Sequence, residues 1–443
     1  MFSPPAHNGP MRTSISRRAL SLGAAAAFVL AAAGAARAHA RAVPCDADNA
    51  SLTLPPGFCA TVFADKVGAP RHMVVAPNGD LLVIGNPFQT NAEAGGARTG
   101  GSLMLLRDAN GDGKADLIMK LQPGSGSGIA LANGYLYSSA GTNIVRYKYA
   151  TGDTALGPPD TVLTGIATSG HTAYNFKIIG STIYMNVGSR TNACQPPDLD
   201  RKGKAPGVDP CVELDTRAGV WTFDANKLGQ RPSDGVRFAT GMRNSVSLTV
   251  NPRDNTLWAT MHGRDQLNDW GFTDDYNAEN PGEQVNHILK GDNFGWPYCY
   301  FSTEEKRLVT APEYGGDGKQ SARCGAAKQP EYVFPGHWAP NDMMFYSGSA
   351  FPAKYKDGAF IAFHGSWNRA PKPQQGFRVV FLPMKGGKTG PSEDFATDFS
   401  NAGGPGRDGR IHRPTGLVQG ADGSLYIADD VGGTIYKVSY RGK

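Results

Sequence analysis

Short apolar runs recur along the chain, and each is paired with a second run across a turn rich in Gly, Asn or Asp. Leu81–Val83 and Leu425–Ile427 are two runs that follow such turns. Runs this short, bounded by turn residues, are typical of β-strands. The turns lie at Pro77–Asp80, Ala132–Gly134, Ile179–Ser181, Asn251–Asn255, Lys356–Gly358 and Ala421–Gly423.

Each of these six turns belongs to one repeated unit, which reads polar loop, strand, turn, strand, polar loop. A β unit repeated in this way predicts an all-β protein, a six-bladed β-propeller. Between residues 262 and 340 the repeat widens from about 50 to about 100 residues, which predicts inserted loops. Strands at 58–63 and 433–439 are expected to pair and close the ring.

The repeat also predicts which side chains meet. Two antiparallel strands joined by a tight turn bring the chain back to its starting side, so the loops that flank each pair share one face. Several arginines on one face repel one another unless an anion lies among them, so we expect a polyanionic ligand there. The loops carry Arg71, His72, His171, Arg243, Asn244, His262, Arg264, Asp265, Asn341, Asp342, His364, Arg369, Arg413, Asp429 and Asp430.

The N-terminus has the regions of an export signal. Arg17–Arg18 precedes an Ala-rich apolar run that ends in Ala36–Ala40, a small-residue cleavage pattern. The arginine pair favours the twin-arginine route. We therefore expect residues 1–42 to be a cleaved signal peptide and 43–443 to be a single propeller domain, periplasmic or secreted. A membrane anchor is the alternative, but a run made mostly of Ala and Gly is weakly hydrophobic, so we expect no stable membrane span after cleavage.

Cleavage would also neutralise the chain. The 44 basic residues include five arginines within residues 1–42, and removing these leaves 39 basic against 39 acidic residues. A formally neutral chain gives no global electrostatic support for nucleic acid, so we expect no nucleic-acid partner.

All six cysteines follow the signal, and an even number in an exported chain indicates disulfides. Pairing of neighbours would join Cys45 to Cys59, Cys194 to Cys211 and Cys299 to Cys324, although 15 pairings are possible. No Cys-x-x-Cys-His motif occurs. A covalent c-type haem domain is therefore absent, and if electrons leave the protein they pass to a separate partner.

Two positions in the repeat suggest chemistry. His171 opens one unit, where a neutral imidazole can act as a general base; a histidine satisfied by backbone groups is the alternative. Arg243–Asn244 opens the next unit, and arginine can stabilise a carboxylate or a developing oxyanion; an inter-blade salt bridge is the alternative.

Asp108–Asp116 alternates acidic or amide side chains with glycines, like the first part of a calcium loop. Met119 stands where the loop's final Glu would be. A plain hairpin turn explains the pattern as well, and both interpretations stay open.

A set of motifs, in this order, resembles the soluble PQQ-dependent sugar dehydrogenases, in particular the sorbosone and pyranose dehydrogenase branch. The similarity runs over nearly all of the mature chain. The motifs are Leu54–Phe58, Ala69–Arg71, Gly170–His171, Gly241–Asn244, Gly291–Pro297, His364–Arg369 and Arg413–Gly416.

The resemblance implies a six-bladed propeller that binds pyrroloquinoline quinone (PQQ) and calcium. It implies that His171 takes the hydroxyl proton of the substrate while a hydride passes to the quinone, with Arg243 and Asn244 at the accepting carbonyl. The implied cofactor-carboxylate residues are Arg71, His364, Arg369 and Arg413. The implied calcium ligands are the backbone carbonyls of Gly263, Arg264 and Asp265. The glucose dehydrogenase branch uses a lysine and a close arginine pair, one of which is Ile411 here, so its substrate preference does not carry over.

The leading interpretation is a quinoprotein that oxidises a sugar, either an aldose or a sorbosone-like hydroxy-aldehyde, and passes electrons to an external quinone or cytochrome. A calcium-dependent, lactonase-like propeller hydrolase is one alternative, using Asp342, Asp429 and Asp430. A non-catalytic glycan-binding propeller is the other.

Overall fold

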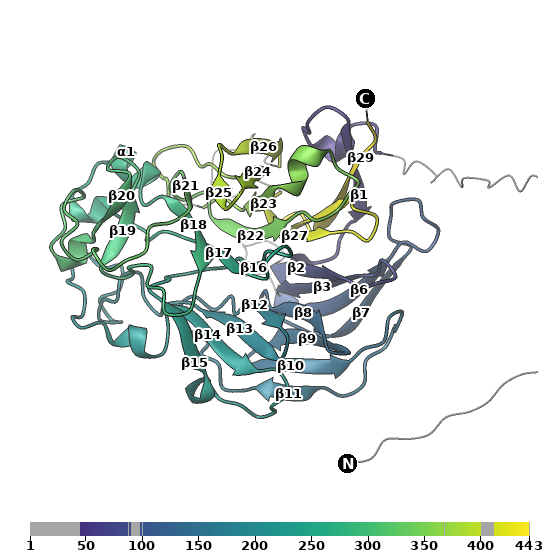
Figure 1. The fold of residues 1–443 in the computed structure, drawn as a ribbon, viewed down its shortest axis with the longest axis horizontal. Coiled ribbons are helices and arrows are strands. Elements are labelled where there is room, and N and C mark those ends of the chain that lie inside the picture. Colours follow the sequence, from purple (N-terminus) through teal and green to yellow (C-terminus); the bar gives the residue numbers. More distant parts are fainter. Residues whose placement is uncertain are drawn as a thin grey trace, which may run out of the picture. The chain divides into compact units, whose positions relative to one another are not determined.

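The structure, a computed structural model, describes residues 45–86, 88–89, 98–99, 101–366, 368–399 and 412–442. The expected signal peptide lies outside these residues. The described residues are mostly strands, and antiparallel sheets form six blades around a common axis (Figure 1). The six-bladed β-propeller predicted from the repeat is confirmed.

The first three blades follow one another along the chain, and each runs from the axis outwards in sequence order. Blade 1 contains β2 (Ala69–Val75), β3 (Leu81–Asn86), β6 (Ser102–Arg107) and β7 (Leu117–Pro123); blade 2 contains β8 (Ile129–Ala132), β9 (Tyr135–Ala140), β10 (Asn143–Lys148) and β11 (Asp160–Leu163); blade 3 contains β12 (Phe176–Ile179), β13 (Thr182–Val187), β14 (Gly219–Asp224) and β15 (Val236–Thr240).

Blades 4 to 6 complete the ring, and the last takes its outer strand from the start of the domain. Blade 4 contains β16 (Leu248–Val250), β17 (Leu257–Met261), β18 (Glu283–Ile288) and β21 (Tyr332–Phe334); blade 5 contains β22 (Pro340–Phe345), β23 (Gly358–Phe363), β24 (Arg378–Lys385), β25 (Lys388–Thr389) and β26 (Glu393–Ala396); blade 6 contains β27 (Pro414–Gln419), β28 (Leu425–Asp429), β29 (Thr434–Tyr440) and β1 (Phe58–Ala64).

The innermost strands contact one another in a closed ring, in the order β2, β8, β12, β16, β22, β27 and back to β2. In the described part of the chain, six apolar clusters fill the spaces between neighbouring blades. A strand with a blade packed on each face is apolar throughout, as in β23, whose six residues are all buried. The outer strand β7 instead alternates, with Ile118 and Lys120 exposed.

The expected closure of the ring by the two chain ends is confirmed. β1 pairs antiparallel with β29, with Phe58 opposite Tyr440, and the two lie side by side in Figure 1. The ring of Phe58 contacts those of Phe351, Phe395 and Tyr355, with centroids 4.8, 5.0 and 5.3 Å away. The N-terminal strand is therefore anchored in the core between blades 5 and 6.

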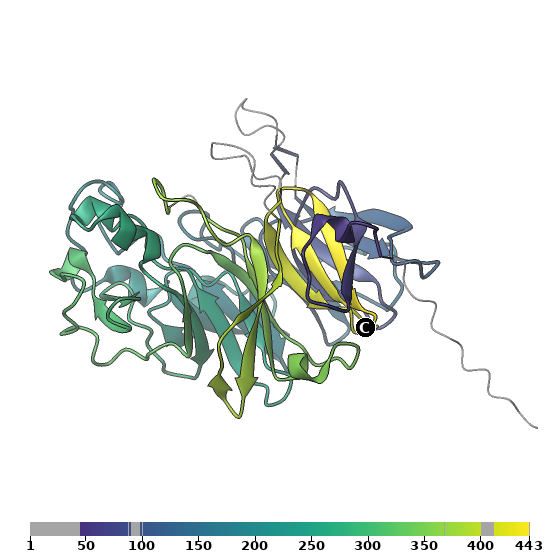
Figure 2. The ribbon, with the colours of Figure 1, turned by 90° about the horizontal axis from the view of Figure 1, so that it is seen from above.

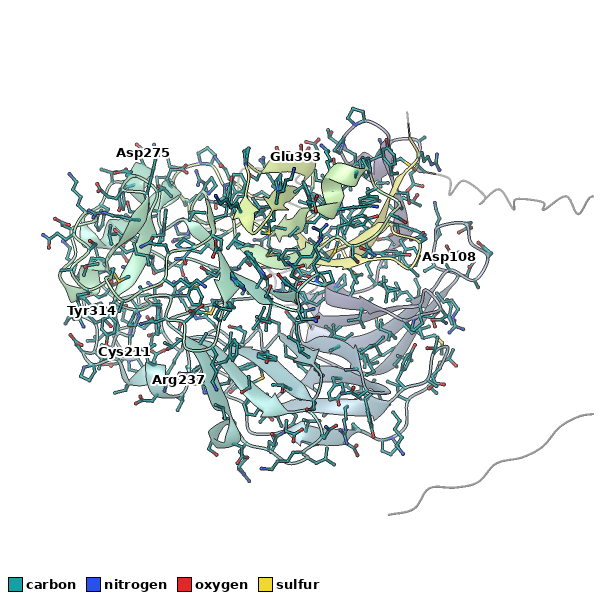
Figure 3. All side chains as sticks on the ribbon, viewed as in Figure 1. Asp108, Cys211, Arg237, Asp275, Tyr314 and Glu393 are labelled. Carbon is teal, nitrogen blue, oxygen red and sulfur yellow. A yellow bond between two sulfur atoms is a disulfide. The ribbon has the colours of Figure 1, made fainter. Side chains whose placement is uncertain are left out.

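The widened repeat is an insertion in blade 4, as expected. It contains α1 (Asp274–Glu279) and the hairpin β19 (Cys299–Ser302)–β20 (Arg307–Thr310), at the end of the view away from the C-terminus in Figure 2. All three neighbour disulfides are present, Cys45–Cys59, Cys194–Cys211 and Cys299–Cys324. Tyr314 and Cys211, labelled in Figure 3, lie on this side of the molecule, and Tyr298 Oη accepts from the Cys211 backbone N–H at 2.9 Å.

Five of the six predicted turns join the two inner strands of a blade directly, while in blade 5 a 3₁₀ helix precedes Asp357. The short pair β4 (Phe88–Gln89) and β5 (Arg98–Thr99) completes the strands. The 3₁₀ helices are η1 (Asn49–Ser51), η2 (Val212–Asp215), η3 (Pro232–Asp234), η4 (Asn268–Trp270), η5 (Pro312–Tyr314) and η6 (Ala353–Lys356). Among the described residues, no helix has the length and apolarity needed to cross a bilayer.

The pairing of β1 with β29, which closes the ring, gives a first prediction. Phe58→Ala should lower the free energy of unfolding by about 3–5 kcal/mol, because it removes a buried ring from four aromatic neighbours, the three above and Tyr440. Ile118→Ala, at a residue that is 46% exposed, is the control and should change it by less than about 0.5 kcal/mol. Chemical denaturation measures both; equal effects would contradict the anchoring role.

Candidate active site

The loops at one face of the propeller bring together cations from three blades. Arg71 of β2 donates through Nη1 to Asp430 Oδ2 at 2.6 Å, and His364 Nε2 lies 2.7 Å from Asp430 Oδ1. Arg71 and His364 are almost 300 residues apart in sequence, but closure of the ring leaves only blade 6 between their blades. One carboxylate therefore joins the two cofactor candidates.

Arg413 extends this group. Its guanidinium donates to the carbonyl of His364 at 2.8 Å and also to that of Gly365. Close packing of the inner strands makes the arrangement possible: a Cβ at Gly416 would lie 1.8 Å from the Arg71 carbonyl oxygen. Only glycine fits there, so the sequence at 416 allows β27 to approach β2.

The charges in this group depend on one another. Burial alone would raise the pKa of Asp430, but the charges and hydrogen bonds of His364 and Arg71 lower it by more, so the pKa is well below its ordinary value. Burial lowers the pKa of His364, and Arg413 lowers it further, against an opposing effect of Asp430. Asp430 is therefore a carboxylate at neutral pH, with Arg71 as its permanent cationic partner.

His171 has a defined tautomer. Its Nδ1 lies 3.0 Å from the carbonyl oxygen of Ser189 and 2.9 Å from Ser189 Oγ. The Ser189 hydroxyl donates its own proton to the carbonyl of Thr191 at 2.7 Å. Both oxygens therefore present lone pairs to Nδ1, which must carry the proton. The lone pair of the neutral ring is on Nε2, the form that a general base requires.

The surroundings of His171 keep the ring neutral. Burial lowers its pKa well below the usual value of 6.5, and the nearby positive charge of Arg243 lowers it further. The segment that carries His171 lies close to Gly188, where a Cβ would come within 2.6 Å of His171 Cβ. The base candidate is thus fixed in both orientation and protonation state.

Arg243 lies in a second charged group. It donates to Asp265 Oδ2 at 2.7 Å, to the Gly263 carbonyl at 2.7 Å, and to the carbonyl and side-chain oxygens of Asn192 at 3.2 and 3.0 Å. These bonds use four of its five N–H groups, and one on Nη1 is left. Asp265 also pairs with Arg201 at 2.6 Å, and although burial raises its pKa, Arg243 and Arg201 lower it well below normal.

A cavity of about 440 Å³ opens on this face and includes three of the predicted residues. Its size is in the range of sites for small-molecule cofactors. Its lining residues are Arg71, Asn86, Ser125, Gly126, Ser127, Ser139, Gly141, Ala167, Thr168, His171, Thr172, Ala173, Tyr174, Asn244 and Val246.

The cavity residues fit an anionic, hydrogen-bonding cofactor such as PQQ. Arg71 supplies a cation, and Asn244 Oδ1 is a buried oxygen that has no hydrogen-bond partner among the described residues. A buried polar atom of this kind calls for a ligand or a water molecule. The cavity thus combines a base, a cation and an unused acceptor.

Two of the three backbone carbonyls predicted to bind calcium already accept hydrogen bonds. The Gly263 carbonyl accepts from Arg243, and the Asp265 carbonyl accepts from Asn192 Nδ2 at 2.9 Å. The side chain of Arg264 forms a buried ion pair with Glu313 at 2.7 Å. Cationic side chains surround this loop, and they would oppose a bare cation unless an anionic ligand came with it. The described residues contain no group of three His, Cys, Asp or Glu side chains placed to hold a metal ion.

The prediction for Arg369 needs correction. Its guanidinium is buried and donates to the carbonyls of Ala278, Gly336 and Pro373, at 2.5, 3.0 and 3.0 Å, and to Glu279 at 2.6 Å. Four of its five N–H groups are used in this way. Arg369 therefore ties blade 5 to the blade 4 insertion. Of the predicted residues, Arg243, His364, Arg369 and Arg413 do not line the cavity, but Arg243, His364 and Arg413 contact residues of the two charged groups beside it.

Other acidic candidates are also committed to local contacts. Asp342 accepts from the backbone N–H groups of Met343 and Leu417, and Asp429 lies 2.5 Å from His412 Nδ1. With Asp430 bound to Arg71, the carboxylates proposed for a hydrolase do not converge on one point. In the 108–116 loop (Asp108 is labelled in Figure 3), Asp108 and Asp116 accept from the loop's own N–H groups, the geometry of a hairpin turn.

Sequence analysis missed Ser189 and Asn192, which hold His171 and Arg243 respectively. Neither lies in a motif, and serine and asparagine are ordinary loop residues, so no local signal marks them. Their importance comes from contacts across the fold.

The fold is a six-bladed propeller with a cavity that Arg71, His171 and Asn244 line, and comparison with known proteins places it in a family. The TrAA12-like family model matches residues 52–441. The chain belongs to this family.

Among its relatives is the pyrroloquinoline quinone-dependent pyranose dehydrogenase of Coprinopsis cinerea, 27% identical over 431 residues that cover 86% of this chain. The chain spans only 53% of that enzyme's length. A pyrroloquinoline quinone-dependent sugar dehydrogenase of Hypocrea jecorina is 25% identical over 73% of this chain and 76% of its own.

Solved structures show the same fold. The holo form of the Coprinopsis pyranose dehydrogenase PQQ domain matches with a TM-score of 0.69 and 22% identity, covering 88% of this chain and 97% of that domain. The calcium structure of the Trichoderma reesei family AA12 enzyme matches with a TM-score of 0.70 and 19% identity over the same shares.

The geometry at His171 predicts a specific spectrum. In the apoprotein, ¹⁵N NMR should show His171 protonated at Nδ1 and unprotonated at Nε2, and still neutral at pH 6, because a lowered pKa extends the neutral form to lower pH. The variant His171→Gln assigns the signal. A ring that titrates near its usual pKa of 6.5, or carries its proton on Nε2, would contradict this assignment.

Proposed function

We propose that this chain is a quinoprotein dehydrogenase that oxidises a sugar, an aldose or a sorbosone-like hydroxy-aldehyde, with PQQ as cofactor and a separate electron acceptor. The observation that carries the proposal is a cavity lined by Arg71, His171 and Asn244 in a member of the TrAA12-like family. A cation, a neutral base and an unused acceptor are the groups such a reaction needs.

His171 is the proposed catalytic base. With Nδ1–H held by Ser189, Nε2 would take the proton of the substrate hydroxyl as the carbon beside it is oxidised. Bound PQQ would supply the two-electron acceptor for that carbon. The remaining N–H of Arg243 and the amide of Asn244 are proposed to stabilise negative charge and orient the bound groups.

Arg71, His364 and Arg413 are proposed to hold the cofactor's carboxylates. Support comes from their mutual contacts around Asp430 and the His364–Gly365 backbone. Arginine suits this role, since its planar fork can bind a carboxylate through two N–H groups. Arg369 is left out of the proposed site because its N–H groups are used elsewhere.

Calcium at the backbone carbonyls of Gly263, Arg264 and Asp265 stays a prediction. It would require an anionic ligand to offset the surrounding arginines, and no step of the proposed reaction depends on it. Export of the mature chain to the periplasm or the medium likewise rests on the signal in residues 1–42.

A titration tests the function. Purified mature protein is titrated with PQQ, with and without Ca²⁺, and then given a panel of sugars with an artificial acceptor. We expect stoichiometric binding and bleaching of the oxidised quinone by at least one sugar. His171→Gln should bind PQQ as tightly but turn over at least about 100-fold more slowly, because only the base is lost. Failure to bind micromolar PQQ would overturn the proposal.

The proposed binding of the cofactor's carboxylates by Arg71 and Arg413, here called the carboxylate clamp, has its own test. Arg71→Ala and Arg413→Ala should each weaken PQQ binding by about 10- to 100-fold, the effect of losing a charge-assisted hydrogen bond. Arg378→Ala is the control, since Arg378 pairs with Asp394 on an outer strand at 2.9 Å. Fluorescence titration of the apoproteins measures the affinities, and a clamp variant that binds like the control would contradict the assignment.

A further inference from the structure

A second cavity, of about 220 Å³, lies beside the first on blade 3. Its walls are apolar and aromatic, and one cationic side chain completes them. The main wall residues are Ile166, Met185, Val187, Trp221, Phe223 and Arg217. No residue of the proposed catalytic group lines it.

Arg217 is the unusual member of this lining. It is 91% buried, since its relative exposure is 9%. It donates to the carbonyls of Gly188 and Ser169, both at 2.8 Å. Among the described residues, no carboxylate pairs with it, and its Nη1 makes no hydrogen bond. Nη1 is not among the fully buried unpartnered atoms of the described residues, so its N–H groups are open to an acceptor from a ligand or solvent in the cavity.

The second cavity opens to solvent and lies next to the first cavity. Gly165, Thr216 and Pro232 at its edge are exposed, so the cavity opens outwards. Tyr174 and Ala167 line both cavities, and Tyr174 Oη donates to the Ala167 carbonyl at 2.6 Å. A wall one residue thick therefore separates the two cavities.

We propose that the second cavity binds a quinone-type electron acceptor, a planar ring with carbonyl oxygens. The aromatic walls suit the ring, and Arg217 can donate to one of its carbonyls. The position next to the first cavity suits electron transfer from it. This proposal rests on the proposed function, since only a dehydrogenase needs an acceptor.

The overall reaction balances. The sugar loses two electrons and two protons as its C–OH carbon becomes a carbonyl carbon. The quinone gains two electrons and two protons and becomes a hydroquinone. The cofactor returns to its oxidised form, so no further oxidant is required.

The first test is binding to the apoprotein, which needs no activity. The probe is tetramethyl-1,4-benzoquinone, and the readout is saturable quenching of tryptophan fluorescence that is lost in Trp221→Phe. Thr216→Trp, which fills the cavity mouth, should weaken binding at least tenfold. The control is Val212→Trp, at a neighbouring residue that is exposed and does not line the cavity; it should bind normally. Arg217→Gln should also weaken binding, and unchanged binding in both Thr216→Trp and Arg217→Gln overturns the proposal.

The second test uses the PQQ-loaded enzyme with two acceptors. Thr216→Trp should raise the KM for the quinone at least tenfold and leave sugar oxidation with ferricyanide unchanged, because ferricyanide is a charged complex that does not fit an apolar cavity. Equal KM values for the quinone in Thr216→Trp and Val212→Trp would overturn the proposal. A Thr216→Trp effect on the KM of an aryl-substituted sugar alone would also overturn it, by assigning the cavity to substrate. If no sugar is oxidised with either acceptor, the proposed function fails, while the binding test still reports on the cavity.

Discussion

Two partly buried carboxylates hold the cations of this site in place. Asp430 lies between Arg71 and His364, and Asp265 lies between Arg243 and Arg201. Unpaired buried charges are costly, and repulsion between neighbouring arginines would separate the loops. Each carboxylate offsets this repulsion and also leaves some N–H groups of its arginines unused. The site is thereby held ready for an anionic ligand before any ligand binds.

The two charged groups depend on different parts of the fold. The Asp430 group joins loops of blades 1, 5 and 6, which the closed ring holds together. The Asp265 group is supported by the blade 4 insertion, through the buried pair of Arg264 with Glu313. A propeller core of apolar clusters between blades keeps these loops at fixed positions. The rigid strands thus fix the positions of the site's side chains, most of which lie in the loops that follow or precede these strands.

Hydrogen bonds of Ser189, Asn192 and Arg217 connect the loops around His171, the base candidate. Arg217 donates to the carbonyls of Ser169 and Gly188, which belong to the two segments that contain His171 and Ser189. Ser189 in turn sets the tautomer of the His171 ring. The wall between the two cavities, at Tyr174, belongs to the same segment.

The sequence by itself determined the β repeat, the pairing of strands from the two chain ends and the blade 4 insertion, because these follow from strand periodicity and local spacing. Which of the 15 possible disulfide pairings occurs was decided by the structure. It also placed Arg71, His171, His364 and Arg413 on one face. Only the tertiary structure decided what each side chain does there. Arg369 occupies a loop position like the others, yet its N–H groups bond to backbone carbonyls of the insertion. Hydrogen-bond partners from distant loops decide such roles, and their positions are set by how the blades pack together, which a linear pattern does not encode.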